Sequence, residues 1–295
     1  MFKPKIIFVA KICISVIILS FLIRSIQAPT LFAAFHSAKW HFLGIAAFFV
    51  APNLLIQTLK WFYILRLANP SVSLSTAFRS LLIGYPLGFV TPGRLGEIGR
   101  AFFVPEIEKQ NVLRLFALDK AANLIVIICA GVWSLLFLQR LPYPVSGVWA
   151  GVILILSLAA MIGVFFLSVK PIKAIGRFIK IPDFNKRNLA LILGFSISFY
   201  VIYLAQFLVL LFAFETNDLS AAAHAAGATF FVKTILPISL GDIGVREGAS
   251  VYYFGKIGFQ AASAFHAALL LFVLNIGVPT LFGLPILHRA SKQSM

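Results

Sequence analysis

The sequence has few charged residues, and acidic residues are the scarcest of them. Only 12% of the 295 residues are charged while 61% are hydrophobic, and nine Asp and Glu residues stand against 25 Lys and Arg residues. A soluble domain is about half apolar and about a quarter charged. The composition therefore excludes a water-soluble globular protein, and the mean hydropathy of +0.99 indicates an integral membrane protein without a soluble domain.

Cysteine and histidine are also scarce, and their positions exclude the sites that they usually build. Cys13 and Cys129 lie in apolar segments, where a thiol behaves as a small hydrophobic group, so we predict no disulfide. The five histidines include no pair at metal-ligand spacing, so we predict no metal and no cofactor. The basic excess does not indicate nucleic acid binding, because the basic residues stand in short loops rather than along one face.

Long apolar windows predict transmembrane helices. A helix needs about 20 mainly apolar residues to cross a bilayer. The first window follows three lysines like a signal peptide, but it lacks a good cleavage site, so we expect a retained helix. We predict an all-α polytopic membrane protein, a single transmembrane domain over residues 1–295 with six full transmembrane helices. The six windows are 6–26, 41–65, 117–138, 148–169, 189–213 and 261–287.

The basic residues between the windows predict the orientation in the membrane. With a cytoplasmic N-terminus, four of them fall on the far side: Arg24, Lys39, Arg140 and Lys256. Cytoplasmic loops carry an excess of Lys and Arg, so the asymmetry predicts cytoplasmic N- and C-termini in an inner or plasma membrane. The seventeen on the cytoplasmic side are Lys3, Lys5, Lys11, Lys60, Arg66, Arg79, Lys109, Arg114, Lys120, Lys170, Lys173, Arg177, Lys180, Lys186, Arg187, Arg289 and Lys292.

This orientation requires two segments between the windows to be re-entrant hairpins. Residues 76–104 would enter and leave on the cytoplasmic side, and residues 220–258 on the far side. Each contains a proline followed by glycines, and proline interrupts a helix because it removes an amide donor and clashes with the preceding turn. The predicted hinge residues are Pro92, Gly93, Gly96, Gly99, Pro237, Gly241 and Gly244.

The two hairpins match each other at an offset of 145 residues. Both contain the pattern P-x-x-L-G-[E/D]-I-G, and three apolar windows map onto three others at the same offset. We therefore predict two repeat halves, residues 1–145 and 146–295, each with three crossings and one hairpin. An odd number of crossings inverts the second half, and inverted repeats with broken helices are typical of transporters.

Ionisable residues cluster in the hairpins, where charges facing lipid would be costly. Glu97 lies three residues from both Arg94 and Arg100, and Asp242 lies four before Arg246, so we predict ion pairs that leave one arginine of the first hairpin without a partner. The candidate substrate-binding residues are Arg94, Glu97, Arg100, Asp119, Lys120, Lys233, Asp242, Arg246 and Glu247.

Arg94 and Arg100 are the predicted headgroup ligands, because the guanidinium fork suits phosphate oxygens. A half-helix starting at Pro92 would also direct its positive end into the membrane. The carboxylates of the second hairpin could accept a cationic amine or carry a proton. Alternatively, all these charges form a network that only fixes the hairpin tips, and Asp119 and Lys120 form a solvated helix end.

The hairpin motifs resemble the lysylphosphatidylglycerol synthase transmembrane-region family. The resemblance rests on TPGRLGEIGR at residues 91–100, PISLGDIGVREG at residues 237–248, and the pair Asp119-Lys120. It covers nearly the whole chain and implies movement of a lipid between leaflets, either an aminoacylated phospholipid or a polyprenyl- or isoprenoid-linked lipid. Synthase members continue into a cytosolic aminoacyl-transfer domain, whereas this sequence stops soon after its last window, so we expect a stand-alone member without that activity.

The leading hypothesis is a lipid flippase with no enzymatic activity, whose charged hairpins line a central cavity. A membrane-embedded transferase is the first alternative, although Asp119, Asp183, Asp218 and Asp242 form no metal-binding pair. A partner subunit of a lipid-synthesising enzyme is the second, with residues 170–187 as its docking surface. Contact of these basic loops with anionic headgroups explains the same residues. Assembly of the protein into a homo-oligomer is a further alternative.

Overall fold

Helices form all the regular structure in the part of the chain that the computed structural model describes, which is residues 4–89, 91, 94–139, 169–181, 184–239 and 242–293. They are α1 (Pro4–Ile26), α2 (Ala28–His36), α3 (Trp40–Phe48), α4 (Val50–Ala68), α5 (Leu74–Phe89), the 3₁₀ helix η1 (Leu95–Phe103), α6 (Lys109–Gln139), α8 (Val169–Phe178), α9 (Lys186–Phe212), α10 (Leu219–Ile235), α11 (Val245–Lys256), α12 (Ala261–Phe272), the π-helix η2 (Val273–Gly277) and α13 (Val278–Gln293).

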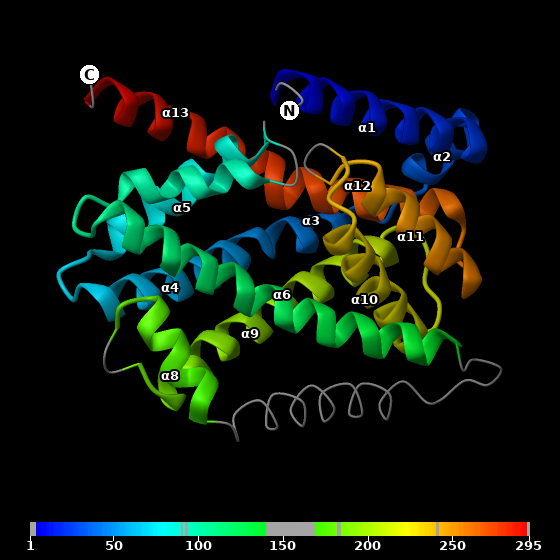
Figure 1. The fold of residues 1–295 in the computed structure, drawn as a ribbon. Helices are drawn as coiled ribbons and strands as arrows, with labels where there is room; N and C mark the ends of the chain where they lie inside the picture. The colour runs from blue at the N-terminus through cyan, green and yellow to red at the C-terminus, as the bar shows by residue number, and fades with distance from the viewer. Residues whose placement is uncertain are drawn as a thin grey trace.

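Four helical stretches are long and apolar enough to cross a membrane: Trp40–Ala68, Lys109–Leu138, Lys186–Phe212 and Ala261–Ala290. They coincide with four of the predicted windows, and they run roughly parallel through the molecule (Figure 1). The chain is therefore a multi-pass membrane protein. The window 148–169 lies outside the described residues except for its last position, so six full crossings stay a prediction.

The first window forms a helix, but it does not continue straight. Residues Ile12–Ile26 meet α2 at an angle of 79°, and Gln27 at the junction has a φ of 70°. Positive φ is uncommon for a residue other than glycine, so the backbone changes direction there. Pro29 then stands in the first turn of α2, where a missing N–H costs nothing. α1 and α2 form a fifth candidate span only if the bent pair is counted as a single crossing.

Each predicted hairpin segment contains a packed pair of helices, while a re-entrant path through the membrane stays a prediction. In the first hairpin α5 packs against η1, and in the second hairpin α10 packs against α11. Figure 1 shows them on opposite sides of the molecule, facing each other across its middle. Their first helices begin 145 residues apart, at Leu74 and Leu219, as the predicted offset requires. The inverted repeat and its two halves stay a prediction.

The predicted hinge residues lie at different places in the two hairpins. Pro237 and Gly244 lie between α10 and α11, and Gly96 and Gly99 lie in η1. The first hairpin differs from the predicted half-helix starting at Pro92, because its returning helix is a 3₁₀ helix that begins at Leu95. The remaining predicted hinge residues, Pro92, Gly93 and Gly241, lie outside the described residues.

The turn of the first hairpin depends on a close approach at Gly96. The Gly96 N–H donates a hydrogen bond of 2.6 Å to the Thr91 hydroxyl, which itself donates to the Leu87 carbonyl at 2.9 Å. A Cβ atom on Gly96 would lie 2.0 Å from that carbonyl oxygen. Only glycine fits at position 96. Arg94, just before η1, has a φ of 57° and takes the left-handed conformation.

Two apolar cores flank the middle of the molecule. One includes Trp61, Leu115 and other buried residues of α4, α5 and α6, and the second contains Phe207, Phe230 and other buried residues of α9 to α12. Packing at native density makes such cores rigid. Each core therefore supports one hairpin, and the space between the hairpins is bounded by fixed walls.

Candidate functional site

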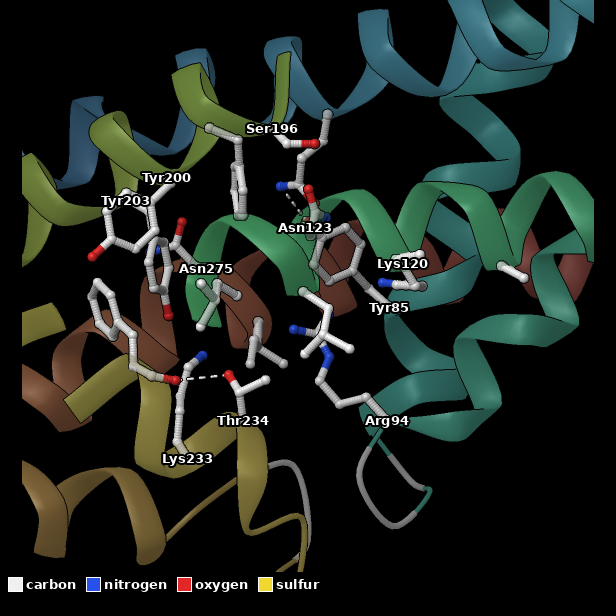
Figure 2. Close-up of a pocket in the computed structure, with 18 residues that line it drawn as sticks. Tyr85, Arg94, Lys120, Asn123, Ser196, Tyr200, Tyr203, Lys233, Thr234 and Asn275 are labelled. Carbon is white, nitrogen blue, oxygen red and sulfur yellow. Dashed lines mark hydrogen bonds between the residues drawn. The ribbon is translucent and has the colours of Figure 1, made fainter. Parts of the chain in front are cut away.

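A cavity of about 530 Å³ lies between the two hairpins, with walls from α4, α5, α6, α9, α10 and η2. We call it the central cavity. Three basic residues line it: Arg94 of the first hairpin, Lys120 of α6 and Lys233 of the second hairpin. Figure 2 shows Arg94 and Lys233 approaching the space from different elements with their charged ends directed inward. Among the described residues, no carboxylate lines the cavity.

Glu97 holds two of these three cations. Its carboxylate forms ion pairs with Arg94 and with Lys120, through one oxygen each. Glu97 itself is buried, whereas the Lys120 side chain is 43% exposed. The Arg94 guanidinium also lies over the Tyr85 ring, 5.5 Å from its centroid. One carboxylate therefore positions two cations at the cavity wall and neutralises only one of them.

Asp119 anchors a second, fully buried group of charges behind this wall. Its carboxylate contacts Lys60 Nζ at 2.9 Å and the Arg100 guanidinium at 2.7 Å. Lys60 also donates to the Asn123 side-chain oxygen at 2.7 Å, and Arg100 lies 4.0 Å from the Trp61 ring centroid. These contacts join α4, α6 and η1 at one point.

The Asp119 network corrects three predictions. Lys60 and Lys120 do not stand in the short loops expected for the basic residues, because Lys60 is buried in α4 and Lys120 lines the central cavity. Their assignment to the cytoplasmic side stays a prediction. Asp119 is buried and paired, so the solvated helix end is wrong. Arg100 is not paired with Glu97 and does not lack a partner, because Asp119 of α6 reaches it. Arg100 does not line the central cavity, whereas Arg94 does.

The second hairpin contains a self-contained ion pair. The Arg246 guanidinium donates to one Glu247 oxygen at 2.8 and 3.2 Å, and both side chains are fully buried. The other Glu247 oxygen accepts a hydrogen bond of 2.6 Å from Gly244 N–H, where φ is 91°. Among the described ion pairs, Arg246 is joined to Glu247 and not to Asp242, the partner predicted from spacing. Asp242 is half-buried, with a φ of 67°, and lies within electrostatic range of Arg94 and Arg246.

Lys233 is the basic residue of the cavity that no described carboxylate pairs with. Its ammonium lies over two aromatic rings, 5.3 Å from the Tyr203 centroid and 5.7 Å from the Phe230 centroid. Aromatic faces attract a cation but leave its hydrogen-bond donors unused. Lys233 therefore presents a charge that an anionic ligand can take.

The geometry suits an anion rather than a metal ion. Arg94, Lys120 and Lys233 carry three positive charges, and the only carboxylate in contact with them among the described residues is Glu97. Within the same part of the chain, no group of three His, Cys, Asp or Glu residues could hold a metal ion. The cavity can bind phosphate oxygens through charge-assisted hydrogen bonds.

A known protein family matches almost the whole chain. The profile of the lysylphosphatidylglycerol synthase TM region matches residues 8–283. The chain belongs to this family. Membership indicates a role connected with membrane lipids, and the matched range includes both hairpins and the central cavity. A comparison with curated proteins found no match.

Neutral polar residues, which were not predicted from the sequence, complete the site. Asn53 donates to Gln206 at 2.6 Å and to Asn275 at 3.1 Å, so three amides from α4, α9 and η2 meet beside the cavity. Gln57 donates to the Tyr85 hydroxyl at 3.1 Å. Asn53, Gln57, Gln206 and Asn275 all lie inside predicted apolar windows. A polar side chain inside such a window is the signal that could have identified them. Lys60, inside the window 41–65, carries the same signal.

Proposed function

We propose that this protein is a translocator that moves a phosphate-bearing lipid between the leaflets of the membrane through the central cavity. The observation that carries the proposal is the excess of positive charge in that cavity, contributed by both hairpins and α6. Charged residues inside a membrane protein cost free energy, and they commonly mark the path of a substrate or ion.

The arrangement of the three cations favours a phosphate group as the bound part of the lipid. Arg94 and Lys120 share the charge of Glu97, and Lys233 contacts only aromatic rings among the groups described. A phosphate would neutralise this excess and accept the donors that remain free. The two lipid types that the family resemblance suggests, aminoacylated phospholipids and polyprenyl- or isoprenoid-linked lipids, both carry phosphate.

The hairpins favour transport over catalysis. Each is a pair of short helices with an interruption beside the cavity, a form that transporters use to line a substrate site. Asp119, the carboxylate directly behind the cavity wall, is bound by Lys60 and Arg100 and is not placed as a free general base. We therefore propose a non-enzymatic translocator of the inner or plasma membrane, with cytoplasmic termini and with basic loops that contact anionic headgroups.

Reconstitution tests the proposal. Purified protein in phosphatidylcholine vesicles would receive trace headgroup-labelled lipids of several classes, and a membrane-impermeant quencher would report transbilayer movement. We expect movement of one or more phosphate-bearing lipids, and a loss of at least about tenfold in the Arg94→Gln, Lys233→Gln variant, since each charge contributes on the order of a tenfold step. Lys256→Gln, which changes an exposed lysine away from the cavity, is the matched control. No movement across the whole panel would contradict the proposal.

A further inference from the structure

A second, smaller cavity lies on the outer side of the central one. It measures about 200 Å³ and is formed by α6, α8 and α9. All of its lining side chains are apolar, including Leu118 and Ile125 of α6, Ile175 and Phe178 of α8, and Leu189 and Leu193 of α9. We call it the apolar groove. Its lining offers no donor or acceptor to a headgroup and suits a hydrocarbon chain.

The apolar groove adjoins the central cavity. Ala117 and Ala121, one turn apart on α6, line both spaces. Both alanines are exposed, and Lys120 stands between them in the sequence with its ammonium at the cavity wall. Two other apolar hollows, around Leu55 and around Phe62, share no lining residue with the central cavity. The shared alanines therefore distinguish this groove from those two hollows.

The side chains at the seam between the two spaces are small. Ala117 and Ala121 of α6 line both spaces, and Ser196 of α9, whose hydroxyl donates to the Ile192 carbonyl at 3.0 Å, lines the central cavity. Although α6 and α9 pack against each other, methyl and hydroxymethyl groups fill little space between their backbones. A single large side chain would close this passage.

Helix α8 gives the groove an interfacial character. Phe178 and Ile179 face the groove, whereas their neighbours Arg177 and Lys180 are exposed. An apolar side combined with exposed basic residues is the arrangement of a helix that lies at the membrane surface, where anionic headgroups attract Lys and Arg. Chains that occupy the groove would thus extend from the headgroup level toward the bilayer core.

We infer that the apolar groove binds an acyl or isoprenoid chain of the transported lipid, and that the lipid reaches the central cavity sideways between α6 and α9. The phosphate passes Ala117 and Ala121, meets Lys120 first, and is then shared with Arg94 and Lys233. The hydrocarbon chain stays in the apolar groove while the headgroup moves, so the chain is never exposed to water. This inference rests on the proposed function and adds to it a chain-binding site and a direction of access.

Photo-crosslinking of the wild-type protein tests chain binding without any substitution. The probe is phosphatidylglycerol with a diazirine midway along one acyl chain, titrated into phosphatidylcholine vesicles that contain the protein. We expect saturable labelling of groove residues such as Ile175, Leu189 and Leu193. Residues on the exposed apolar face of α6, such as Val132 and Leu136, serve as the reference, and their labelling should rise linearly with probe. Linear labelling of the groove, or saturation around Leu55 or Phe62 instead, would overturn the inference.

A blocking variant tests the route. Ala121→Trp fills the seam, and Val132→Trp adds the same side chain to an exposed surface away from both spaces. We expect Ala121→Trp to lower transbilayer movement at least about tenfold because the seam has no room for the added volume, while Val132→Trp leaves it unchanged. Equal thermal stability and monodispersity of both variants would exclude misfolding, and Ala121→Leu gives a graded second test.

The results separate the inference from the proposed function. If Ala121→Trp transports normally while Arg94→Gln, Lys233→Gln does not, the cavity is a transport site and the lateral route is wrong. If the wild type moves no lipid, the proposed function fails, and saturable labelling of the groove still decides whether it binds a chain.

Discussion

The two hairpins carry the same sequence pattern but place their charges differently. In the first hairpin, Glu97 and Arg100 form ion pairs with Lys120 and Asp119 of α6, and Asp119 also contacts Lys60 of α4. In the second, Arg246 pairs with its own neighbour Glu247, which also holds the start of α11. The first hairpin is therefore joined electrostatically to the surrounding spans, and the second is closed on itself.

This difference shows what each hairpin contributes to the site. Because Glu97 and Asp119 fix the cations around the first hairpin, those cations have set positions before a ligand arrives. Lys233 on the second hairpin contacts aromatic rings only, among the described groups, and keeps its charge for the ligand. One hairpin thus supplies preorganised donors and the other supplies an uncompensated charge.

Removing Asp119 should have the largest effect, because it breaks the link between the first hairpin and the spans. Asp119→Asn leaves Lys60 and Arg100 buried without a carboxylate, and we expect a loss of about 3–5 kcal/mol in the free energy of unfolding. Thermal unfolding in detergent measures it. Glu108→Gln, at an exposed carboxylate just before α6, is the control. If both variants unfold alike, the Asp119 network does not hold the hairpin.

Glu247→Ala tests whether the second hairpin is held by its internal pair. The variant leaves the Arg246 guanidinium buried and removes the acceptor for Gly244 N–H, so we expect a loss of about 3 kcal/mol. Asp242→Asn removes the charge of the partner that sequence spacing predicts for Arg246. It should lower the free energy of unfolding by under about 1 kcal/mol, because Asp242 is partly exposed. The same unfolding assay compares them, and the reverse order would restore the predicted Asp242 pair.

Glycine substitutions compare the packing of the two hairpins. Gly96→Ala places a methyl group against the Leu87 carbonyl and should destabilise the protein by about 1–3 kcal/mol. At Gly248 in α11 the nearest atom to an added Cβ is a Leu22 methyl at 4.0 Å, so Gly248→Ala should stabilise helix α11 by about 0.5–1 kcal/mol. Melting temperatures that fall equally in both variants would contradict this account of the first turn.

Lys233→Gln should change ligand binding without changing stability. The side chain has no ion pair to lose among the described residues, so we expect an unchanged melting temperature and a loss of lipid affinity of about tenfold, or ~1.4 kcal/mol. Titration of phosphatidylglycerol in detergent measures the affinity, and Lys233→Arg should restore most of it. A stability loss comparable to that of Glu247→Ala would instead assign Lys233 a structural role.

Much of the fold could be predicted from the sequence because its signals are local. Apolar length predicted four of the candidate spans, and the proline and glycine residues predicted where the helices are interrupted between α5 and η1 and between α10 and α11. The bend between α1 and α2 was not predicted, since it depends on the conformation of a single residue, Gln27.

The site was only partly predictable, because its ion pairs join distant segments. Spacing along the chain correctly paired Arg94 with Glu97. It could not show that Asp119 and Lys120, some twenty residues later in α6, would reach Arg100 and Glu97. Lys60 was counted with the basic residues of the cytoplasmic side, because a charge count does not distinguish a residue buried within a helix from one at the helix end.

The most direct test of the central claim is the amount of lipid that stays bound to the purified protein. Native mass spectrometry would compare the wild type with the single Arg94→Gln and Lys233→Gln variants and with their combination. We predict phosphate-bearing lipid on the wild type, less on each single variant, and almost none on the double variant, since the two hairpins share one ligand. Equal lipid occupancy in all four proteins would contradict the claim and leave the cavity charges a purely structural role.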